Sequence, residues 1–391
     1  MSVWTIEPRD PLVVRDGRPN QGRSESAARA FPLPSTIAGV VRTRLGLGAD
    51  GVFARTSADE LAALRAVAVR GPWLVEPDTG TFYAPTPSDL ALLADADRRT
   101  IAALSPAPVA APLLVDEGLP GDLVPVWAQR HEREGKAKGP PAFLRWDAFA
   151  RWLARPGRRA GEDADSILHG AIDALPRESR LHVQVGEHAT AEDGMLFETE
   201  GLRFVHPETR APLALAVEVD DAAAAKVGSL REGLAPMGGK RRLVRWTRAT
   251  QPLPEVPEPV LNGASLGDTG SRVRVLLLTP ALFEEGWRPR LSPGTPLGPA
   301  EGVTHVRLVA ACVGRPLAIS GWDLAKQQPK RIRRAAPAGS VYWLELTGPP
   351  AARRAWVQRA WAEATSDAEE DRRDGFGVAA IGNVLEEGGA A

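Results

Sequence analysis

Four prolines within eight residues interrupt the chain past its middle. The segment PLPEVPEP begins at Pro252. Neither a helix nor a central strand can continue through it, because proline lacks the backbone N–H and blocks the preceding turn. A chain of 391 residues is long enough for two domains. We therefore expect a Pro/Gly-rich linker over 251–270, with one domain over 1–250 and a second over 271–391.

Apolar residues follow similar patterns on both sides of this linker. Before it, strand patterns occur at 3–6, 181–185, 195–205, 213–219 and 243–246, and helix patterns occur at 35–45 and 220–234. Those after it occur at 272–278, 281–286 (helical), 304–312, 340–346 and from 350 (helical), and GFGVAAIGNV then leads into a last strand. We expect the three strands over 181–219 to form one antiparallel sheet.

This order of strand, helix, two strands, helix and strand predicts the fold class. It is α+β, with two ferredoxin-like (RRM-like, βαββαβ) domains and glycine-rich loops. Residues 52–180 have helical pieces near 58–68 and 142–154 but no clear order. We expect them to be a large insertion in the first domain.

Composition excludes several classes of protein. Lys plus Arg number 48 against 49 Asp plus Glu, so no global positive field attracts nucleic acid, and any such role needs local patches. Cys312 is the only cysteine, which excludes an internal disulfide and fits a reducing, cytoplasmic setting. Charged residues near the N-terminus and the lack of a long apolar run predict neither export nor a membrane span.

Three motifs match enzyme signatures in their letters but differ in their context. Gly46, Gly48 and Gly51 spell G-x-G-x-x-G, yet they follow a predicted helix where a dinucleotide site needs a strand. Ser265 lies in G-x-S-x-G between the linker and a strand, which is not a nucleophile elbow. GLAPMGGKR lacks the Ser or Thr that a P-loop needs after Lys240.

The six histidines show no metal-ligand spacing. Any of them could be the base of a ribonuclease, but nothing in the sequence selects one. We predict no catalytic residue, no metal and no cofactor.

Five segments carry features that suit a polyanion. Arginine offers a planar fork of donors to phosphate, glycine lets a backbone approach closely, and a helix N-terminus has free N–H groups. The segments are RDGRPN from Arg15; STIAGVVRTRL, with Ser35 as N-cap and Gly46 as helix end; MGGKRR from Met237; KQQPKRIRR from Lys326; and Gly375-Phe376-Gly377. Each alone also fits a solvated turn, an ordinary cap or a charged loop. Two acid-free basic patches in a neutral chain favour a polyanionic partner.

In their order along the chain, these segments resemble the third backbone subunit of the Cmr complex. The matching blocks are WTIEPRDPLVVRDGRP, FPLPSTIAGVVRTRL, RLHVQVGEHATAEDGMLFETEGLRF, GWDLAKQQPKRIRRAAPAGSVYWLEL and GFGVAAIG. That complex is the type III-B CRISPR RNA-guided effector, and the subunit belongs to the RAMP superfamily. Each block is weak alone, and their number and order make the resemblance specific. Residues 52–180 carry little of it.

The resemblance implies a noncatalytic subunit. Such subunits hold the 5′ tag of the CRISPR RNA at the foot of the complex and contact the large polymerase-like subunit and adjacent RAMP backbone subunits, while target RNA is met indirectly. The RNA-binding residues that it implies are Arg15, Gly17, Arg18, Ser35, Thr36, Arg42, Gly238, Gly239, Lys240, Arg241, Lys330, Arg331, Gly375 and Gly377. Family members often have an aromatic residue after DGRP, where this chain has Asn20, which argues against base stacking there.

Two alternatives accompany this prediction. One is a RAMP-type endoribonuclease that processes precursor CRISPR RNA, and the other is the equivalent subunit of another type III subtype. The first needs a positioned histidine, tyrosine or lysine for proton transfer. The chain has only 2 tyrosines and no histidine within a recognisable motif, so we predict that it is not an enzyme.

Overall fold

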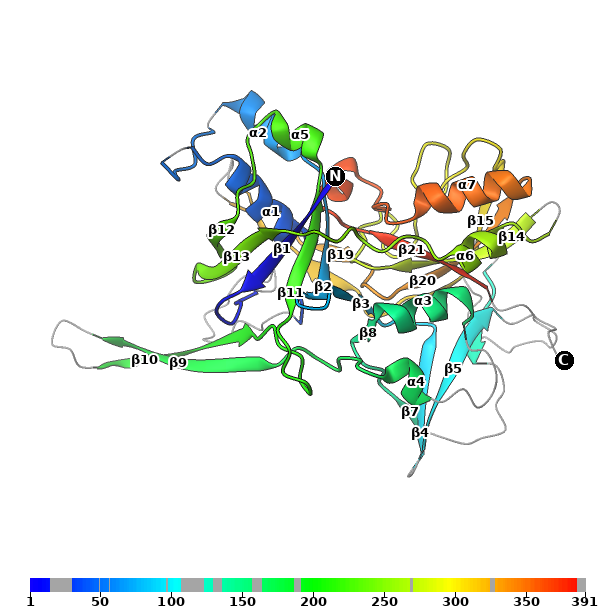
Figure 1. The fold of residues 1–391 in the computed structure, drawn as a ribbon, viewed down its shortest axis with the longest axis horizontal. Helices are drawn as coiled ribbons and strands as arrows, with labels where there is room; N and C mark the ends of the chain where they lie inside the picture. Colours follow the sequence, from blue (N-terminus) through cyan, green and yellow to red (C-terminus); the bar gives the residue numbers. More distant parts are fainter. Residues whose placement is uncertain are drawn as a thin grey trace. The chain divides into compact units, whose positions relative to one another are not determined.

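A computed structural model describes residues 1–14, 30–48, 50–55, 57–95, 98–106, 123–128, 136–156, 164–185, 191–267, 270–323 and 328–384 (Figure 1). Contacts between residues divide the chain into two compact units. Unit 1 comprises Met1–Thr81, Ala174–Pro252 and Ala318–Arg334, and unit 2 comprises Phe82–Asp173, Leu253–Leu317 and Ala335–Ala391. One boundary falls inside the proline-rich segment. Residues 82–173, expected within the first domain, group with unit 2 instead.

The main sheet of unit 1 combines strands from both ends of its sequence. Its strands are β1 (Ser2–Pro8), β2 (Val69–Glu76), β11 (Ala214–Val219), β12 (Gly233–Met237) and β13 (Arg242–Arg248). They lie in the order β12-β13-β1-β11-β2, and each neighbouring pair is antiparallel. Two helices, α1 (Pro34–Leu45) and α2 (Ala58–Ala66), connect β1 to β2, and α5 (Asp221–Ala225) follows β11. The order of strand, helix, two strands, helix and strand recurs here, but β2 lies within 52–180, which was expected to be an insertion, and β12 is an added edge strand. The ferredoxin-like assignment stays a prediction.

Helix α1 covers one face of this sheet because its apolar residues recur every four positions. Ile37, Val41 and Leu45 are fully buried, and the strands contribute buried residues such as Ile6 and Trp246. The helix ends at Gly46 as predicted, but the N-cap is Leu33, not Ser35. Proline suits the first helical position, so the helix begins at Pro34, and Ser35 lies inside its first turn.

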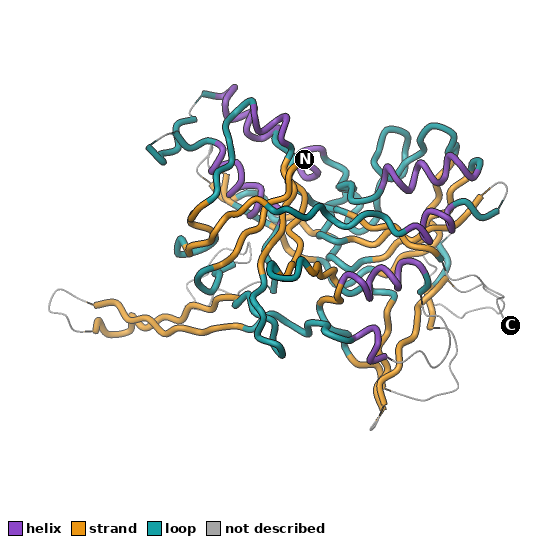
Figure 2. The backbone as a smooth tube through the Cα atoms, viewed as in Figure 1, coloured by secondary structure: helices purple, strands orange, loops and turns teal. Residues whose placement is uncertain are grey.

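Strands β9 (Arg177–Val185) and β10 (Ala191–Leu202) form a two-stranded antiparallel ribbon (Figure 2), and Leu202 at the end of β10 also forms a bridge with Leu12. The expectation of one sheet over 181–219 is therefore wrong, since β11 lies in the main sheet of unit 1. Their apolar alternation misled the prediction, because Leu181 and Val183 face solvent.

The helix expected over 220–234 is also shorter than predicted and ends with α5. A Cβ on Gly228 would lie 2.1 Å from the Leu45 carbonyl oxygen, so the chain passes closely over the end of α1 at this point. Two further ladders occupy 317–335, where β16 (Leu317–Ile319) pairs with β19 (Arg333–Ala335) and β17 (Trp322–Asp323) pairs with β18 (Gln328–Pro329).

Unit 2 contains a four-stranded antiparallel sheet in its C-terminal part. It consists of β14 (Gly270–Leu277), β15 (His305–Cys312), β20 (Val341–Thr347) and β21 (Ala379–Asn383), in the order β15-β20-β14-β21. Helices α6 (Glu258–Ala264), α7 (Pro350–Ala360) and α8 (Glu369–Arg373) flank these strands in sequence. The helix expected near 281–286 is absent from this fully described stretch. It forms turns and isolated bridges, including Phe283 with Gly286, whose φ is +77°.

Residues 82–173 contribute further strands and helices to unit 2. They are β3 (Thr81–Pro85), β4 (Leu90–Asp95), β5 (Arg98–Pro106), β6 (Val126–Ala128), β7 (Lys136–Lys138), β8 (Phe143–Arg145), α3 (Trp146–Ala154) and α4 (Ala164–Leu168). A small sheet has the order β6-β5-β4-β7, and β3 pairs with β8. Helices α2 and α3 confirm the helical pieces predicted in the otherwise unreadable segment.

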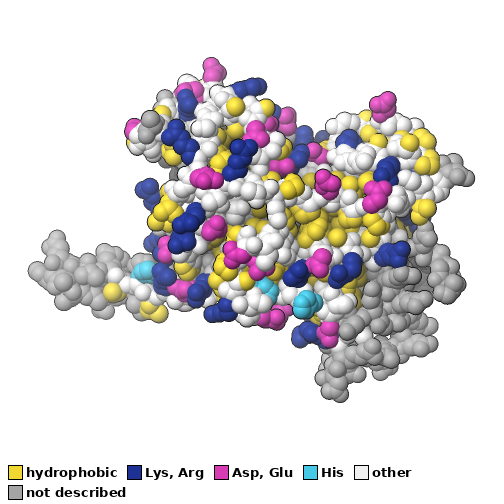
Figure 3. Space-filling view, in the orientation of Figure 1, with side chains coloured by type: hydrophobic (Ala, Val, Ile, Leu, Met, Phe, Trp, Pro, Cys, Tyr) yellow, Lys and Arg dark blue, Asp and Glu magenta, His cyan; other side chains and the backbone are white. Residues whose placement is uncertain are grey.

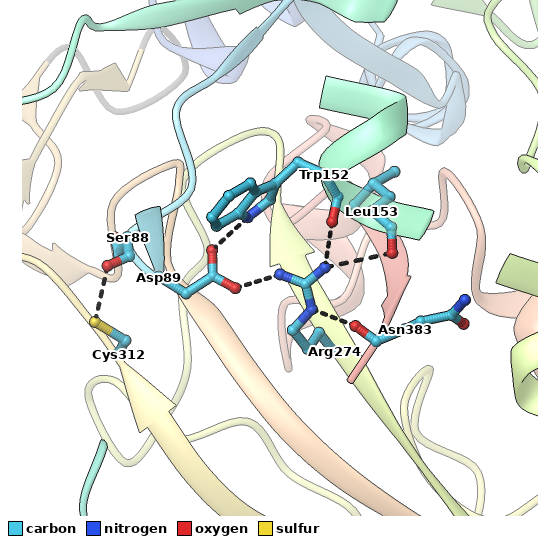
Figure 4. A network of polar contacts seen from close by, with 7 residues as sticks. All are labelled: Ser88, Asp89, Trp152, Leu153, Arg274, Cys312 and Asn383. Carbon is cyan, nitrogen blue, oxygen red and sulfur yellow. Dashed lines mark hydrogen bonds and ion pairs between the residues drawn. The ribbon is translucent and has the colours of Figure 1, made fainter. Parts of the chain in front are cut away.

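A buried ion pair explains why this segment belongs with the C-terminal sheet (Figure 4). Arg274 on β14 donates to the carboxylate of Asp89, and both side chains are almost fully buried. Its Nε donates to the Asn383 carbonyl at 2.6 Å and its Nη2 to the Trp152 carbonyl at 2.6 Å, while Trp152 Nε1 donates to Asp89 at 2.9 Å. Strand β14, helix α3 and the end of β21 are thus held by one guanidinium.

Candidate nucleic-acid interface

The turn between β12 and β13 presents the predicted basic residues to solvent. Gly238, Gly239, Lys240 and Arg241 form this turn, and the side chains of Lys240 and Arg241 are exposed. Both basic residues have left-handed backbone, with φ of 59° and 51°. Residues with a side chain rarely adopt this conformation, which costs about 1 kcal/mol or more each. We call residues 238–241 the basic turn.

The glycines of the basic turn are explained by contact with the chain itself. Gly239 N–H donates to the Val13 carbonyl at 2.8 Å. A Cβ on Gly238 would lie 2.9 Å from that same oxygen, and one on Gly239 would lie 3.0 Å from Val13 Cγ1. The two positions therefore need glycine for the approach of residue 13, irrespective of any ligand.

This contact also locates the start of another predicted segment. Val13 and Val14 are buried, and they directly precede Arg15, Gly17 and Arg18, which lie outside the described residues. The chain therefore enters the arginine-rich segment RDGRPN immediately beside the basic turn. The last described residues before RDGRPN thus lie at the end of unit 1 that carries the basic turn.

The direction of α1 brings a third segment to the same end. Arg42 Nη2 donates to the Val67 carbonyl at 3.0 Å, just before β2, and Arg44 lies over Trp246 at 5.1 Å, near the end of β13. The last turn of α1 is thus at the end of the sheet where β2 begins. Its first turn, with half-buried Ser35 and Thr36, points to the opposite end, where β1 finishes and the basic turn lies.

Arg42 serves the fold, since its contact with Val67 ties α1 to the end of α2. Of two other arginines, Arg44 was not singled out from the sequence, and Arg242 was counted only as part of the basic run MGGKRR. Burial lowers the pKa of Arg44, whose Nη2 also donates to the Arg231 carbonyl. Arg242 is half-buried and alternates with Val244 and Trp246 on the covered face of β13. Counting along β13 in steps of two would have separated Arg242 from exposed Arg245.

Lys330 and Arg331 are exposed on the separate hairpin over 317–335. The backbone of Lys330 is fixed there, because its N–H donates to the Gly321 carbonyl at 2.7 Å and its carbonyl accepts from Ser320 Oγ at 2.8 Å. Basic and acidic side chains are interspersed over the face shown in Figure 3. Positive charge is therefore local, as the neutral composition requires.

Gly375 and Gly377 occupy a different environment from the basic turn. Both are buried, with φ of +89° and +84°. Thr279 Oγ1 donates to the Gly375 carbonyl at 2.7 Å, and Thr365 Oγ1 donates to the Gly377 carbonyl at 2.8 Å. A Cβ on Gly377 would lie 2.8 Å from Ser366 N. This loop uses its glycines for packing inside unit 2 and offers no surface to a strand of RNA.

The enzyme-like motifs also have structural uses. Ser265 is the C-cap of α6, and its hydroxyl donates to the Leu261 carbonyl at 3.2 Å. The buried His206 accepts two backbone N–H groups at Nδ1, and His182 Nε2 contacts Thr199 Oγ1 at 2.8 Å. Across the described ranges, no three His, Cys, Asp or Glu residues gather as a metal site. None of the described helices is long and apolar enough to cross a membrane.

Comparison with known proteins identifies the family. The family model of the CRISPR-associated protein Cas_Cmr3 matches residues 4–384. The chain belongs to the Cas_Cmr3 family. It is thus a subunit of the type III-B CRISPR effector, the Cmr complex, as the resemblance predicted. A search of curated proteins found no match.

Solved structures of type III effectors show similarity to this Cas_Cmr3 chain. A chain in the cryo-EM structure of the Type III-B Cmr-beta bound to cognate target RNA and AMPPnP, state 1, is 13% identical with a TM-score of 0.46 over 87% of this chain and 86% of that one. The Type III-B Cmr-beta structure bound to cognate target RNA gives 14% and 0.45 over 87% and 86%. The Csm3-Csm4 subcomplex of the type III-A interference complex gives 10% and 0.32 over 89% and 94%.

Proposed function

We propose that this Cas_Cmr3 subunit is a noncatalytic RNA-binding member of its effector, which holds the 5′ tag of the CRISPR RNA and docks the large polymerase-like subunit. The main observation that supports RNA binding is the basic turn. Lys240 and Arg241 project from a hairpin tip with strained, fixed backbone. Such strain persists where the surrounding structure holds it and is concentrated at ligand sites.

Three features at one end of unit 1 suit the same ligand. The basic turn supplies two exposed cations, Val13 beside it precedes RDGRPN by two residues in the sequence, and the first turn of α1 carries the partial positive charge of a helix N-terminus. A single RNA strand presents successive phosphates, so separate cationic groups can each hold one. Phosphate contacts of this kind fix the position of a strand and leave its bases to be read elsewhere.

Two of the six histidines, His182 and His206, favour a noncatalytic role. Each forms a hydrogen bond within the fold, His206 with backbone N–H groups and His182 with Thr199. A general base needs instead a ring nitrogen within reach of the proton that it removes from the substrate. The proposed interface is Arg15, Arg18, Ser35, Thr36, Lys240 and Arg241, with Lys330 and Arg331 as a second basic surface. Arg42, Gly375 and Gly377 are left out because the fold uses them.

The test measures how tightly the assembled complex retains CRISPR RNA at several salt concentrations. Lys240→Ala and Arg241→Ala should each weaken retention and lower the salt slope by about 0.7, because each removes one phosphate contact on a single strand. Lys330→Ala and Arg331→Ala extend the series to the second surface. Lys226→Ala and Arg65→Ala are matched controls, since both side chains are exposed on unit 1 away from the proposed interface.

An unchanged salt slope in both basic-turn variants would remove the turn from the interface. Preference for the tag sequence should stay constant throughout, since phosphate contacts carry no base information. Metal-independent cutting of labelled repeat RNA by the purified subunit would overturn the noncatalytic proposal and favour a processing endoribonuclease.

A further inference from the structure

The turn between α1 and α2 exposes three apolar side chains within seven residues. Leu47 is 38% exposed, Val52 62% and Phe53 41%. A single exposed apolar residue needs no explanation, but a cluster on one turn is typical of a protein-binding surface. We call these three residues the Phe53 turn.

Backbone hydrogen bonds hold the Phe53 turn in place. Gly48 N–H donates to the Val52 carbonyl at 2.8 Å, and Ala54 N–H donates to the Gly46 carbonyl at 3.1 Å. The Asp50 carboxylate accepts from Val52 N–H at 3.0 Å, and Leu47 forms a bridge with Phe53. A surface that is ordered before binding loses little conformational freedom when a partner arrives.

The ring of Phe53 is supported by the end of α1. A Cβ on Gly46 would lie only 2.3 Å from Phe53 Cε2, so the ring rests against the glycine backbone. That support closes one side of the ring and leaves the other side in solvent. Phe53 is therefore fixed in an orientation that keeps its outer face available.

The charges around the Phe53 turn differ from those of the basic turn. Asp50 and Asp59 are exposed beside it, and Arg55, the nearest basic residue along the chain, is paired with Glu60 at 3.1 Å. The turn follows the last turn of α1, whereas the basic turn lies at the other end of this helix of about 17 Å. Arg42 and Arg44, in the preceding turn of α1, donate to the carbonyls of Val67 and Arg231. Among the described residues 46–59 the exposed charged side chains are therefore Asp50 and Asp59, and their carboxylates repel phosphates and favour a protein partner with basic groups.

We propose that the Phe53 turn docks another protein subunit of the effector, by inserting Phe53 and its neighbours into an apolar pocket bordered by lysine or arginine. This inference rests on the part of the proposed function in which the subunit docks another protein, and it names the residues that do so. Unit 1 then binds RNA at one end of α1 and protein at the other. Apolar anchors seated in a pocket carry most of the affinity of such interfaces.

The test is reconstitution of the complex from separately purified subunits. Phe53→Ser should raise the concentration of this subunit needed for half-maximal incorporation about tenfold or more, with smaller increases for Val52→Ser and Leu47→Ser. Phe53→Leu, which keeps an apolar side chain, should recover much of the loss. Leu266→Ser is the matched control, because Leu266 is a similarly exposed leucine in unit 2.

A photo-reactive phenylalanine analogue at position 52 identifies the occupant. Crosslinking to a protein subunit of the reconstituted effector is expected, and crosslinking to RNA would overturn the proposal. Unchanged incorporation of Phe53→Ser would also overturn it. Thermal unfolding of each variant separates docking from misfolding, because the exposed serine variants should unfold close to the wild type. The salt slope for RNA should stay unchanged in these variants, so failure here is distinguishable from failure of the RNA-binding proposal.

Discussion

The main sheet of unit 1 and the C-terminal sheet of unit 2 each have a glycine-containing turn before a strand that pairs with their first strand. In unit 1 the basic turn precedes β13, which pairs with β1, and in unit 2 the loop with Gly375 and Gly377 precedes β21, which pairs with β14. The basic turn is exposed and carries two cations. The loop in unit 2 is buried and is surrounded by the hydroxyls of Thr279, Thr365 and Ser366.

The comparison shows that a glycine motif predicts a close approach without saying what approaches. Gly239 admits the backbone of Val13, and Gly377 admits the backbone of Ser366. In both places the chain itself fills the space that a ligand could have occupied. The surroundings differ, because unit 1 has exposed basic side chains beside its glycines and unit 2 has a packed interior around its own.

The largest effect is expected in unit 2, from Arg274→Leu. This variant leaves the Asp89 carboxylate buried without its cation, which should lower the free energy of unfolding by about 3–5 kcal/mol. Chemical denaturation measures the change. The double variant Arg274→Leu/Asp89→Leu should lose less than Arg274→Leu alone, because it removes the stranded charge. A loss below about 1 kcal/mol in the single variant would contradict the structural role given to this ion pair.

The next effect separates the two glycine turns. Gly377→Ala should destabilise by about 2–4 kcal/mol, since the φ of +84° disfavours a side chain and the new methyl would meet Ser366 N at 2.8 Å. It should leave the salt slope of CRISPR RNA retention unchanged. Gly39→Ala is the control, because nothing lies within 4 Å of its Cβ in α1 and the change should stabilise by about 1 kcal/mol. A stable Gly377→Ala protein with weakened RNA retention would reverse the comparison.

A smaller effect separates strain from charge in the basic turn. Arg241→Gly and Arg241→Ala both remove the cation, so they should lower the salt slope equally. Only glycine relieves the left-handed backbone at φ 51°, so Arg241→Gly should be more stable than Arg241→Ala by about 1 kcal/mol. Thermal unfolding and RNA retention on the same two proteins measure both quantities. Equal stability would show that the backbone at position 241 is unstrained.

The last prediction concerns the labelling rate of Cys312 in unit 2 and involves no expected change in the free energy of unfolding. Burial, assisted by the Asp89 carboxylate, raises the pKa of Cys312 to about 11. A raised pKa means that the reactive thiolate forms only at higher pH, so labelling by iodoacetamide should accelerate about tenfold per pH unit from 7 to 10. A free thiol levels off near its ordinary pKa of about 8.5. Levelling near pH 9 would show that Cys312 is more open than its environment indicates. Arg241→Gly should leave this profile unchanged.

Local patterns predicted many of the elements in advance, but not the strands over 69–145. Alternation predicted β13, β14, β15 and β20, and apolar spacing predicted α1 and α7, because burying one face imposes a period on any strand or helix. The motif order also led to the correct family, which the family model confirms over 4–384. The failures include 181–219, where Leu181 and Val183 face solvent despite their alternation, and 281–286, where buried Ala281, Leu282 and Phe283 lie in turns and isolated bridges instead of a helix. The helix expected over 220–234 was also too long.

The candidate site divides in the same way. Exposed Lys240 and Arg241 could be identified from the sequence, because an acid-free basic run beside glycines is a local feature. The sequence could not show that Arg42 donates to the Val67 carbonyl, because the two residues are 25 positions apart. It also could not show that Gly375 and Gly377 are buried, because their contacts come from several separate segments.

By itself, the sequence predicted those strands, helices and basic turns whose pattern depends on neighbours along the chain, such as α1, β13 and the basic turn. Only the tertiary structure decided what each glycine and arginine contacts. Arg274 and Asp89 are 185 residues apart in the sequence, and Val13 and Gly239 are also distant, so no local pattern reports either contact. Burial then decides the role of each group, because a buried guanidinium must be satisfied by the fold, whereas an exposed one is available to bind phosphate.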